Sequence, residues 1–240
     1  MGELITTKFK LSVVIPCYNE SNRIEKTIIE LTKFFFTNRA IFTYELIFID
    51  DGSTDDTYEK VNYMSEQYPN IRVLTYNRNA GKGFAVRTGL KEAKYDNILI
   101  LDADLSVKPN NLLNSILWFN FNDTEPFAVI GERIQVIKQP IYRIFAGLCF
   151  RNLVKVLFKL PFNDTQNPYK VLHNIHKDFY NYLKTDGFSY DVELLYKLKQ
   201  YQIDTYKTRV MYFNDTESKV TIKKAIKMFF ELLRIRFPKK

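Results

Sequence analysis

The chain has 240 residues, of which 46% are hydrophobic, and its formal net charge is +8 at pH 7. This composition excludes an intrinsically disordered protein, and the length suits one α/β domain with appended elements. Cys17 and Cys149 form no CxxC pair, so neither a disulfide framework nor a cysteine zinc site is expected. The basic excess favours phosphate-bearing partners or an anionic membrane surface.

Targeting and membrane-spanning signals are not apparent in the sequence. The opening stretch, MGELITTKFK, lacks the apolar core of a signal peptide, and no run approaches the ~20 apolar residues that a spanning helix requires. We therefore expect a chain on the cytoplasmic side of a membrane, with peripheral membrane association. Nucleic-acid binding is not expected, because the basic residues fall on apolar helical segments and no RNA-binding motif is present.

Short apolar runs alternate with longer amphipathic segments over the first half of the chain. This alternation predicts an α/β fold with a mostly parallel sheet and helices on both faces. Ser53 and Asp56 have the spacing of a capping box and predict the start of the second helix. The predicted strands are residues 11–15, 44–49, 71–76, 98–101 and 127–130, and the predicted helices are residues 21–36, a segment opening at residue 53, residues 84–93 and a segment starting at Pro109.

The residues that follow the strands are informative, because parallel sheets bind ligands at the carboxyl ends of their strands. After the third strand, Gly81 and Gly83 can bring the backbone close to a ligand, with Lys82 as a point charge for phosphate. Neither a P-loop nor GxGxxG is present, which argues against an ATPase and a nicotinamide enzyme. The four polar clusters are PCYNE (16–20), DDGS (50–53), NRNAGKG (77–83) and DAD (102–104).

The cluster after the fourth predicted strand indicates the clearest chemistry. Asp102 and Asp104 are separated by Ala103 alone, so their carboxylates can converge at a turn. Two like charges this close repel each other, and a divalent cation relieves the repulsion. An acidic turn without a ligand is the alternative for this stretch alone, but four polar clusters in register with four strands favour a binding site.

Several motifs together resemble one enzyme family. VVIPCYNE, FIDDGSTDDT, NRNAGKGFAVRTGL and LDADLS are similar to the nucleotide-sugar half of the family 2 glycosyltransferases, which have the GT-A (Rossmann-like) fold. GER (131–133), DTQ (164–166) with Lys170, and FSYDVELL (188–195) resemble counterparts in the polyprenyl-phosphate branch. That branch includes the dolichyl-phosphate glucosyltransferases and the dolichol-phosphate mannose synthases, and the resemblance covers about residues 10–237.

The resemblance implies a donor site at the carboxyl ends of the strands. Asp51 would contact the edge of the nucleotide base, and Asp102 would face the ribose and the metal. Asp104 would ligate a Mg²⁺ or Mn²⁺ ion that bridges the donor diphosphate, and carboxylate oxygens suit both cations. The nucleotide-sugar-binding residues expected on this basis are Pro16, Tyr18, Glu20, Asp51, Lys82 and Asp102.

Residues in the second half of the chain are expected to bind the acceptor. Arg133 and Arg143 can hold a lipid phosphate with their planar, permanently charged groups. By the resemblance, Asp164 is a candidate catalytic base. Orientation of metal and acceptor is an equally good account of Asp164, since a phosphate monoester is already largely anionic at neutral pH. Lys170 is predicted to act with these residues in catalysis.

Two helical segments combine apolar and basic residues. Within residues 141–160, Arg151, Lys155 and Lys159 recur every four residues along an otherwise apolar helix. Residues 219–240 form a second basic amphipathic segment. Both patterns are typical of helices that lie in a membrane interface, and a core-packed helix with a solvated basic face is the alternative. Asp191 and Glu193 either organise the acceptor loop or cap the helix that follows.

These features predict an inverting, metal-dependent glycosyltransferase that moves a hexose, with glucose from UDP-glucose favoured, to a polyprenyl or dolichyl phosphate. GDP-mannose as donor and a glycan hydroxyl as acceptor are the alternatives within this class. A non-catalytic nucleotide-sugar-binding protein at membranes is the alternative from another class. We expect a nucleotide-sugar-binding half (1–135), an acceptor-binding half of the same catalytic domain (136–218) and a C-terminal helix (219–240).

Overall fold

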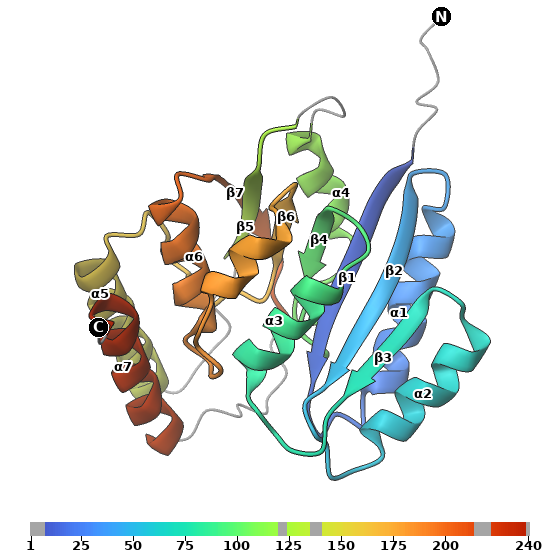
Figure 1. Cartoon of the computed structure of the whole chain (residues 1–240), viewed down its shortest axis with the longest axis horizontal. Coiled ribbons are helices and arrows are strands. Elements are labelled where there is room, and N and C mark those ends of the chain that lie inside the picture. The colour runs from blue at the N-terminus through green and yellow to red at the C-terminus, as the bar shows by residue number, and fades with distance from the viewer. Residues whose placement is uncertain (1–7, 120–123, 135–140, 214–221, 239–240) are drawn as a thin grey trace, which may run out of the picture.

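The computed structural model describes residues 8–119, 124–134, 141–213 and 222–238 (Figure 1). Its seven-stranded sheet has the order β3-β2-β1-β4-β6-β5-β7. The strands are β1 (Phe9–Cys17), β2 (Phe42–Asp50), β3 (Ile71–Thr75), β4 (Asn97–Ile100), β5 (Phe127–Arg133), β6 (Lys170–His173) and β7 (Asp204–Val210). The α-helices are α1 (Ile24–Thr37), α2 (Thr57–Gln67), α3 (Lys82–Glu92), α4 (Asn111–Ser115), α5 (Ile141–Phe158), α6 (Tyr190–Gln200) and α7 (Ile222–Arg236), and short 3₁₀ segments cover η1 (Ile116–Trp118) and η2 (Lys177–Tyr182).

The sheet is mostly parallel. β1 pairs in parallel with β2 and β4, β2 with β3, and β5 with β7. β6 lies between β4 and β5 and is antiparallel to both. The predicted α/β class and the five predicted strands are therefore confirmed, and every described strand except β6 ends at the same edge of the sheet.

The sequence pattern does not predict β6 and β7. β6 has only 4 residues, and β7 (DTYKTRV) is mostly polar, with only Thr208 and Val210 buried. Short strands and strands at a sheet edge have weak hydrophobic periodicity, so neither was distinguishable from a loop. β6 matters for the site because it brings Lys170 into the middle of the sheet.

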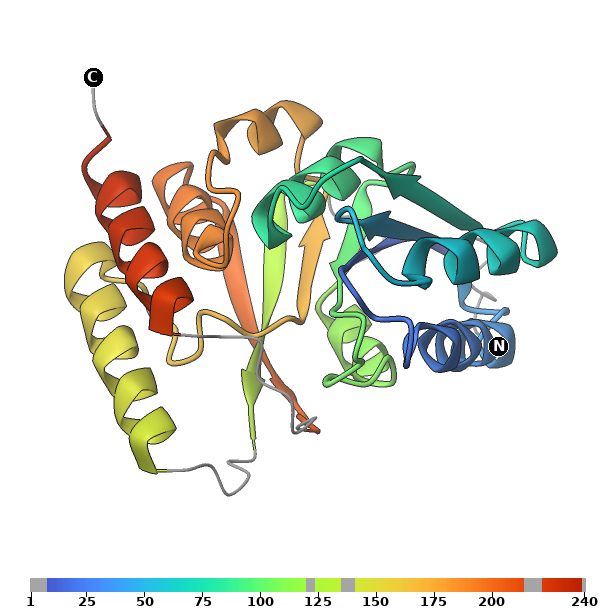
Figure 2. The same ribbon diagram turned by 90° about the horizontal axis from the view of Figure 1, so that it is seen from below.

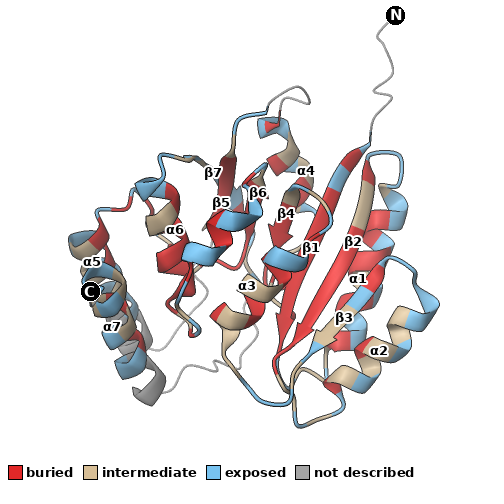
Figure 3. Cartoon of the chain, viewed as in Figure 1, coloured by how far each residue is buried: buried red, intermediate tan, exposed pale blue. Residues whose placement is uncertain are grey.

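Helices cover both faces of the sheet (Figure 2). Consecutive strand residues alternate between the two cores, as a period of two requires: Val13 belongs to one core and Val14 to the other. The first core packs against α1, α2 and α4, and the second packs against α3, α5, α6 and α7. Figure 3 shows that the central strands are almost entirely buried between these layers.

The predicted capping box at Ser53 is wrong. α2 begins only at Thr57, and Asp56, which precedes it, makes no side-chain capping bond. The hydroxyl oxygen of Ser53 instead accepts a hydrogen bond from the Asn19 N–H at 2.9 Å. This contact joins the loop after β1 to the loop after β2, so the local spacing of polar residues serves a long-range contact rather than a helix start. The helix predicted from Pro109 is present but short, as α4.

α5 and α7 lie side by side, at the end of the molecule opposite β3 (Figures 1 and 2). The Arg236 Nε–H donates to the carbonyl oxygen of Leu157 at 2.9 Å, which joins the last turns of the two helices. Met228 and Leu232 are buried on one side of α7, and Leu232 belongs to the second core. Within the described ranges, no helix combines the length and apolar character needed to cross a membrane.

Candidate active site

The polar residues that follow the parallel strands meet at one edge of the sheet. Asp51 follows β2, Asp102 and Asp104 follow β4, and Arg133 ends β5. β7 ends beside Arg133 in parallel register, so Tyr212 reaches the same edge. α1 and α3 begin just after β1 and β3, and their N-terminal ends carry partial positive charge at this edge. α2 begins equally soon after β2, so the edge combines carboxylates, an arginine and the N-termini of α1, α2 and α3.

The acidic turn after β4 is held in a defined conformation. The Thr27 hydroxyl of α1 donates to the carbonyl oxygen of Ala103 at 2.6 Å, and the Ser106 N–H donates to Asp104 Oδ1 at 2.8 Å. Leu105 has a φ of 48°, in the left-handed region that a leucine rarely adopts. Such strain persists only where the surrounding contacts impose it, and it concentrates at functional sites. The carboxylates of this turn are therefore positioned before any ligand binds.

Asp51 is buried, and its carboxylate accepts hydrogen bonds from the backbone of the loop before α3. Its Oδ1 accepts a hydrogen bond from the Ala80 N–H at 2.7 Å, and its Oδ2 accepts one from the Gly81 N–H at 2.9 Å. Burial raises the pKa of Asp51, although the two N–H groups act in the opposite direction. Asp51 thus joins the end of β2 to the loop before α3, and its contact with a nucleotide base stays a prediction.

Lys82, the first residue of α3, lies beside the acidic turn. Its Nζ is 2.6 Å from Asp102 Oδ1. Burial alone would lower the pKa of Lys82, but the charges of Asp102 and Asp191 outweigh burial and raise this pKa. The ammonium group therefore stays protonated at neutral pH and offsets part of the negative charge of the turn. The Nζ also lies 5.9 Å from the centre of the Tyr190 ring.

The two glycines that flank Lys82 make room for the chain's own backbone. A Cβ on Gly81 would lie 2.3 Å from the carbonyl oxygen of Asp186, and one on Gly83 would lie 2.3 Å from that of Thr185. The Gly83 N–H donates to the Asp186 carbonyl oxygen at 2.8 Å. The expectation that this room is open to a ligand is therefore corrected: at these two positions, the backbone of residues 185–187 fills it and covers the N-terminus of α3.

Arg133 and Asp164, both predicted on the acceptor side, are brought together by the fold. Arg133 Nε lies 2.7 Å from Asp164 Oδ2, and Arg133 Cζ lies 4.3 Å from the centre of the Tyr212 ring. Burial raises the pKa of Tyr212, Arg133 lowers it, and Asp104 and Asp102 raise it further. Tyr212 is therefore close to both charged groups. Sequence reasoning missed it because its placement depends on β7, which has no clear strand pattern.

Lys170 is fully buried in the middle of the sheet. Its ammonium group donates hydrogen bonds to the Asp191 carboxylate and to the carbonyl oxygen of Asn167. Two charges removed from water in this way depend on each other, because an unpaired buried charge is costly. The charge of Asp191 also raises the pKa of Lys82. Direct participation of Lys170 in catalysis stays a prediction.

The remaining predicted residues surround the loop after β1. Pro16 is buried within β1, whereas Tyr18 is 37% exposed. Glu20 Oε2 lies 2.9 Å from Arg23 Nε, at the start of α1. Arg143 belongs to α5, but its side chain lies outside the described part of the chain. Contact of these residues with a nucleotide or an acceptor stays a prediction.

The donor set at the turn fits a hard divalent cation. Asp102 and Asp104 offer carboxylate oxygens, the ligands that Mg²⁺ and Mn²⁺ prefer. Among the described residues there is no group of three or more His, Cys, Asp or Glu that could hold a metal ion. A cation held by this turn would therefore complete its coordination with phosphate oxygens and water, as is usual for Mg²⁺ in substrate complexes.

The fold and the acidic turn at the strand ends define a class, the glycosyltransferases of the GT-A fold. Among solved structures, glucosyl-3-phosphoglycerate synthase from Mycobacterium tuberculosis aligns over 96% of this chain and 81% of its own, with a TM-score of 0.69 and 18% identity. A mannosyltransferase from Pyrobaculum calidifontis aligns over 89% of this chain and 59% of its own, with a TM-score of 0.59 and 18% identity. At these identities the likeness establishes the fold.

The sequence comparisons define the family more closely. The model of glycosyl transferase family 2 matches residues 12–167. The dolichyl-phosphate beta-glucosyltransferase of Saccharomyces cerevisiae is 30% identical over 94% of this chain and 74% of its own length. That of Mus musculus is 32% identical over 81% of this chain and 64% of its own length, slightly less than two thirds. The chain therefore belongs to glycosyltransferase family 2.

Proposed function

We propose that this chain transfers glucose from UDP-glucose to dolichyl phosphate, with inversion at the anomeric carbon and with Mg²⁺ or Mn²⁺ as cofactor. The observation that carries the proposal is that two charged groups share one sheet edge: the acidic turn with Lys82, and the ion pair of Arg133 with Asp164. The relatives named dolichyl-phosphate beta-glucosyltransferase support the choice of sugar and acceptor. A mycobacterial structure with Mn²⁺ and UDP-glucose supports the choice of metal and nucleotide.

Positive charge is the main requirement on the donor side, because the leaving UDP becomes more negative as its bond to glucose breaks. Asp104 and Asp102 would hold the divalent cation, which, when bound, stabilises that negative charge. Lys82 contributes a second positive charge from its place beside Asp102. Because the Gly83 N–H is already bonded to Asp186, the Lys82 side chain, rather than that N–H, is available to a phosphate oxygen.

The acceptor side needs orientation more than proton removal. The second pKa of a phosphate monoester is about 6, so a lipid phosphate is already a nucleophile at neutral pH. Asp164 pairs with the Nε of Arg133, and within the described residues the two terminal nitrogens of Arg133 make no hydrogen bond or ion pair. These nitrogens can form a bidentate pair with phosphate. We therefore assign phosphate binding to Arg133 and the orientation of Arg133 to Asp164.

The outer face of α7 suits contact with a membrane. Ile226, Phe229 and Phe230 are 55%, 42% and 55% exposed, although all three are large apolar residues. Lys227 and Arg234 are exposed on the same helix. Apolar residues that enter the headgroup region and cations that attract anionic lipid are the two requirements of an interfacial helix. On this basis the lipid tail of the acceptor stays in the bilayer while its phosphate reaches the sheet edge.

A transfer assay with several labelled donors tests the proposal. The protein would be incubated with Mn²⁺, liposomes that contain dolichyl phosphate, and either UDP-glucose, UDP-galactose or GDP-mannose. We expect lipid-linked glucose from UDP-glucose and little product from the other donors. Lipid-linked mannose would favour the mannose synthase alternative, and transfer only to a soluble sugar would favour a hydroxyl acceptor. Absence of any lipid-linked product would contradict the proposal.

A further inference from the structure

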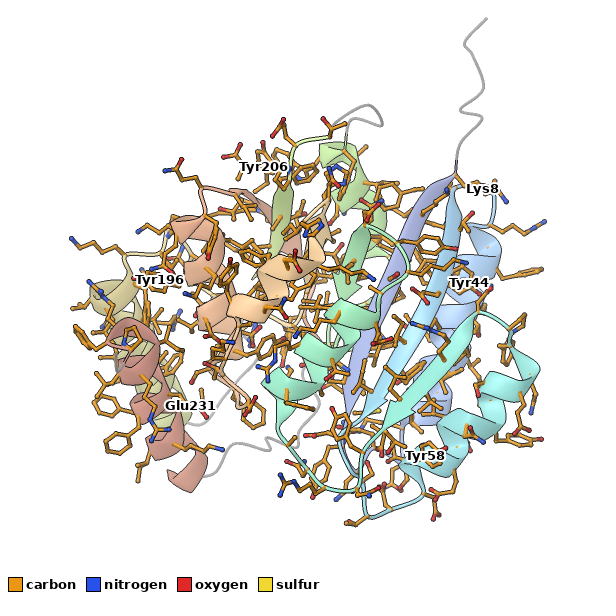
Figure 4. The ribbon with its side chains drawn as sticks, in the orientation of Figure 1. Lys8, Tyr44, Tyr58, Tyr196, Tyr206 and Glu231 are labelled. Atoms are coloured by element: carbon orange, nitrogen blue, oxygen red, sulfur yellow. The ribbon has the colours of Figure 1, made fainter. Side chains whose placement is uncertain are left out.

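The only acidic residue of α7 is directed into the protein. Glu231 is the one acid among residues 222–236, and its side chain is 11% exposed. Its Oε2 accepts a hydrogen bond from the Ser189 N–H at 3.3 Å, and the Ser189 hydroxyl donates to the carbonyl oxygen of Met228 at 3.2 Å. Figure 4 shows Glu231 on the side of α7 that faces the rest of the chain. Two hydrogen bonds thus join α7 to Ser189.

The position of Glu231 is favourable because Ser189 immediately precedes α6. A carboxylate at a helix N-terminus is stabilised by the partial positive charge there. The carboxylate also lies close against Gly187, since a Cβ on Gly187 would be 2.3 Å from Glu231 Oε1. Lys227, one turn earlier in α7, lies 3.9 Å from the same oxygen but is largely exposed. The main contact of Glu231 is therefore with residues 187–189, the segment before α6, rather than with Lys227.

That segment reaches the donor site. Glu193 accepts hydrogen bonds from the backbone of Lys184 and Thr185, which fixes the start of the segment. The Asp186 carbonyl oxygen then accepts the Gly83 N–H, and the Asp186 carboxylate lies 2.6 Å from the guanidinium of Arg87. Residues 184–189 are therefore bound by α7 at one end and cover the N-terminus of α3, where Lys82 begins the helix, at the other.

We propose that Glu231 is a positioning residue that makes the placement of Lys82 depend on the docking of α7. When α7 is docked, Glu231 holds residues 184–189 against α3, and α3 directs Lys82 toward Asp102. Because the outer face of α7 is the face assigned to the membrane, membrane contact and donor binding would strengthen each other by linkage. This inference rests on the proposed function in two respects only: that α7 contacts a membrane and that the donor nucleotide is UDP.

Nucleotide affinity tests this inference without any acceptor. Glu231→Gln keeps the size of the side chain and removes its charge. Calorimetry of UDP with Mn²⁺ should show affinity weakened about 3- to 10-fold, within the range by which residues between coupled sites act. Glu59→Gln, an exposed acid of α2, makes the same charge change and should bind UDP like the wild type. A lower melting temperature with unchanged UDP affinity would show a merely structural role and overturn the inference.

A second variant displaces the carboxylate without removing it. Gly187→Ala places a methyl group 2.3 Å from the present position of Glu231 Oε1, so the Glu231 carboxylate has to move. We expect the same weakening of UDP binding, and the double variant should be no weaker than the more affected single variant, because both changes act on one contact, that of Glu231 with Ser189. Additive losses would contradict the inference. If Glu231→Gln does not fold, Gly187→Ala alone decides between the two outcomes.

Vesicles separate the inference from the proposed function. Anionic phosphatidylserine vesicles should tighten UDP binding by the wild type and have a smaller effect on Glu231→Gln. Wild-type protein that binds UDP but makes no lipid-linked glucose would contradict the proposed function, while the affinity comparison would still test Glu231. Wild-type transfer activity together with unchanged UDP affinity in both variants would overturn the inference alone.

Discussion

The two halves of the sheet hold their charged residues in different ways. In the first half, Asp51 and the acidic turn after β4 are bound by backbone N–H groups of nearby loops. In the second half, Arg133 pairs with Asp164 and Lys170 with Asp191, each across more than twenty residues of sequence. The carboxylates of the first half are thus held mainly by backbone N–H groups, at sequence separations from 2 residues for Asp104 to 30 residues for Asp51. The second half instead depends on side-chain ion pairs, which form only when β5, β6 and α6 are in place.

Breaking the buried pair should give the largest effect on stability. Lys170→Met leaves Asp191 charged and buried without a partner, which we expect to cost about 3–5 kcal/mol of the free energy of unfolding. Denaturant unfolding measures this cost. A matched Lys170→Met/Asp191→Leu variant should recover part of the loss, because it removes both charges. A single variant that unfolds at the wild-type denaturant concentration would contradict the dependence of this half on ion pairing.

Removing one donor carboxylate should abolish activity while the fold persists. Asp104 is partly exposed and its contact is local, so Asp104→Ala should unfold within about 1 kcal/mol of the wild type. Its turnover should fall by at least about 100-fold, because a metal ligand contributes several kcal/mol to the stabilisation of charge in the transition state. Turnover and thermal unfolding are both measured. Full activity would refute a metal role for Asp104.

Vesicle binding should depend on the outer face of α7, in the second half of the chain, and not on exposed apolar residues of the first half. Phe229→Ser/Phe230→Ser removes two exposed aromatic side chains and should weaken sedimentation with anionic liposomes about tenfold. Phe36→Ser is the matched control, since Phe36 is 68% exposed on α1 in the first half. Equal losses in the two proteins would mean that exposed phenylalanines act non-specifically and that α7 is no special surface.

The rates at which a reagent modifies the two thiols compare the two halves without any substitution. Cys17 lies in the buried sheet of the first half, where burial, followed by the charge of Asp50, raises the pKa of its thiol well above the ordinary value. Cys149 is exposed on α5. Near pH 8, a thiol reagent should therefore modify Cys149 at least about 100-fold faster than Cys17, as peptide mapping would show. Fast labelling of Cys17 would mean that the first half opens readily.

Local patterns were sufficient for the first half and for the polar residues that gather at its strand ends. Five strands follow from short apolar runs, and the acidic turn follows from its place after the fourth of them. The exceptions were contacts between loops. Ser53 has the spacing of a capping residue but binds Asn19, and Gly81 accommodates the backbone of Asp186 rather than remaining open. Spacing reports which residues are near in sequence, not what fills the space around them.

By itself, the sequence determined the α/β class, the strand ends where the candidate site residues gather and the family, because hydrophobic periodicity and the motifs after each strand are local. Only the tertiary structure decided which charged groups meet. The pairing of Lys170 with Asp191, the approach of Tyr212 to Arg133 and the contact of Glu231 with Ser189 all depend on β6, β7 and α7 being in place. Such contacts join residues far apart in the chain, and their free energy comes from burial that no single segment provides.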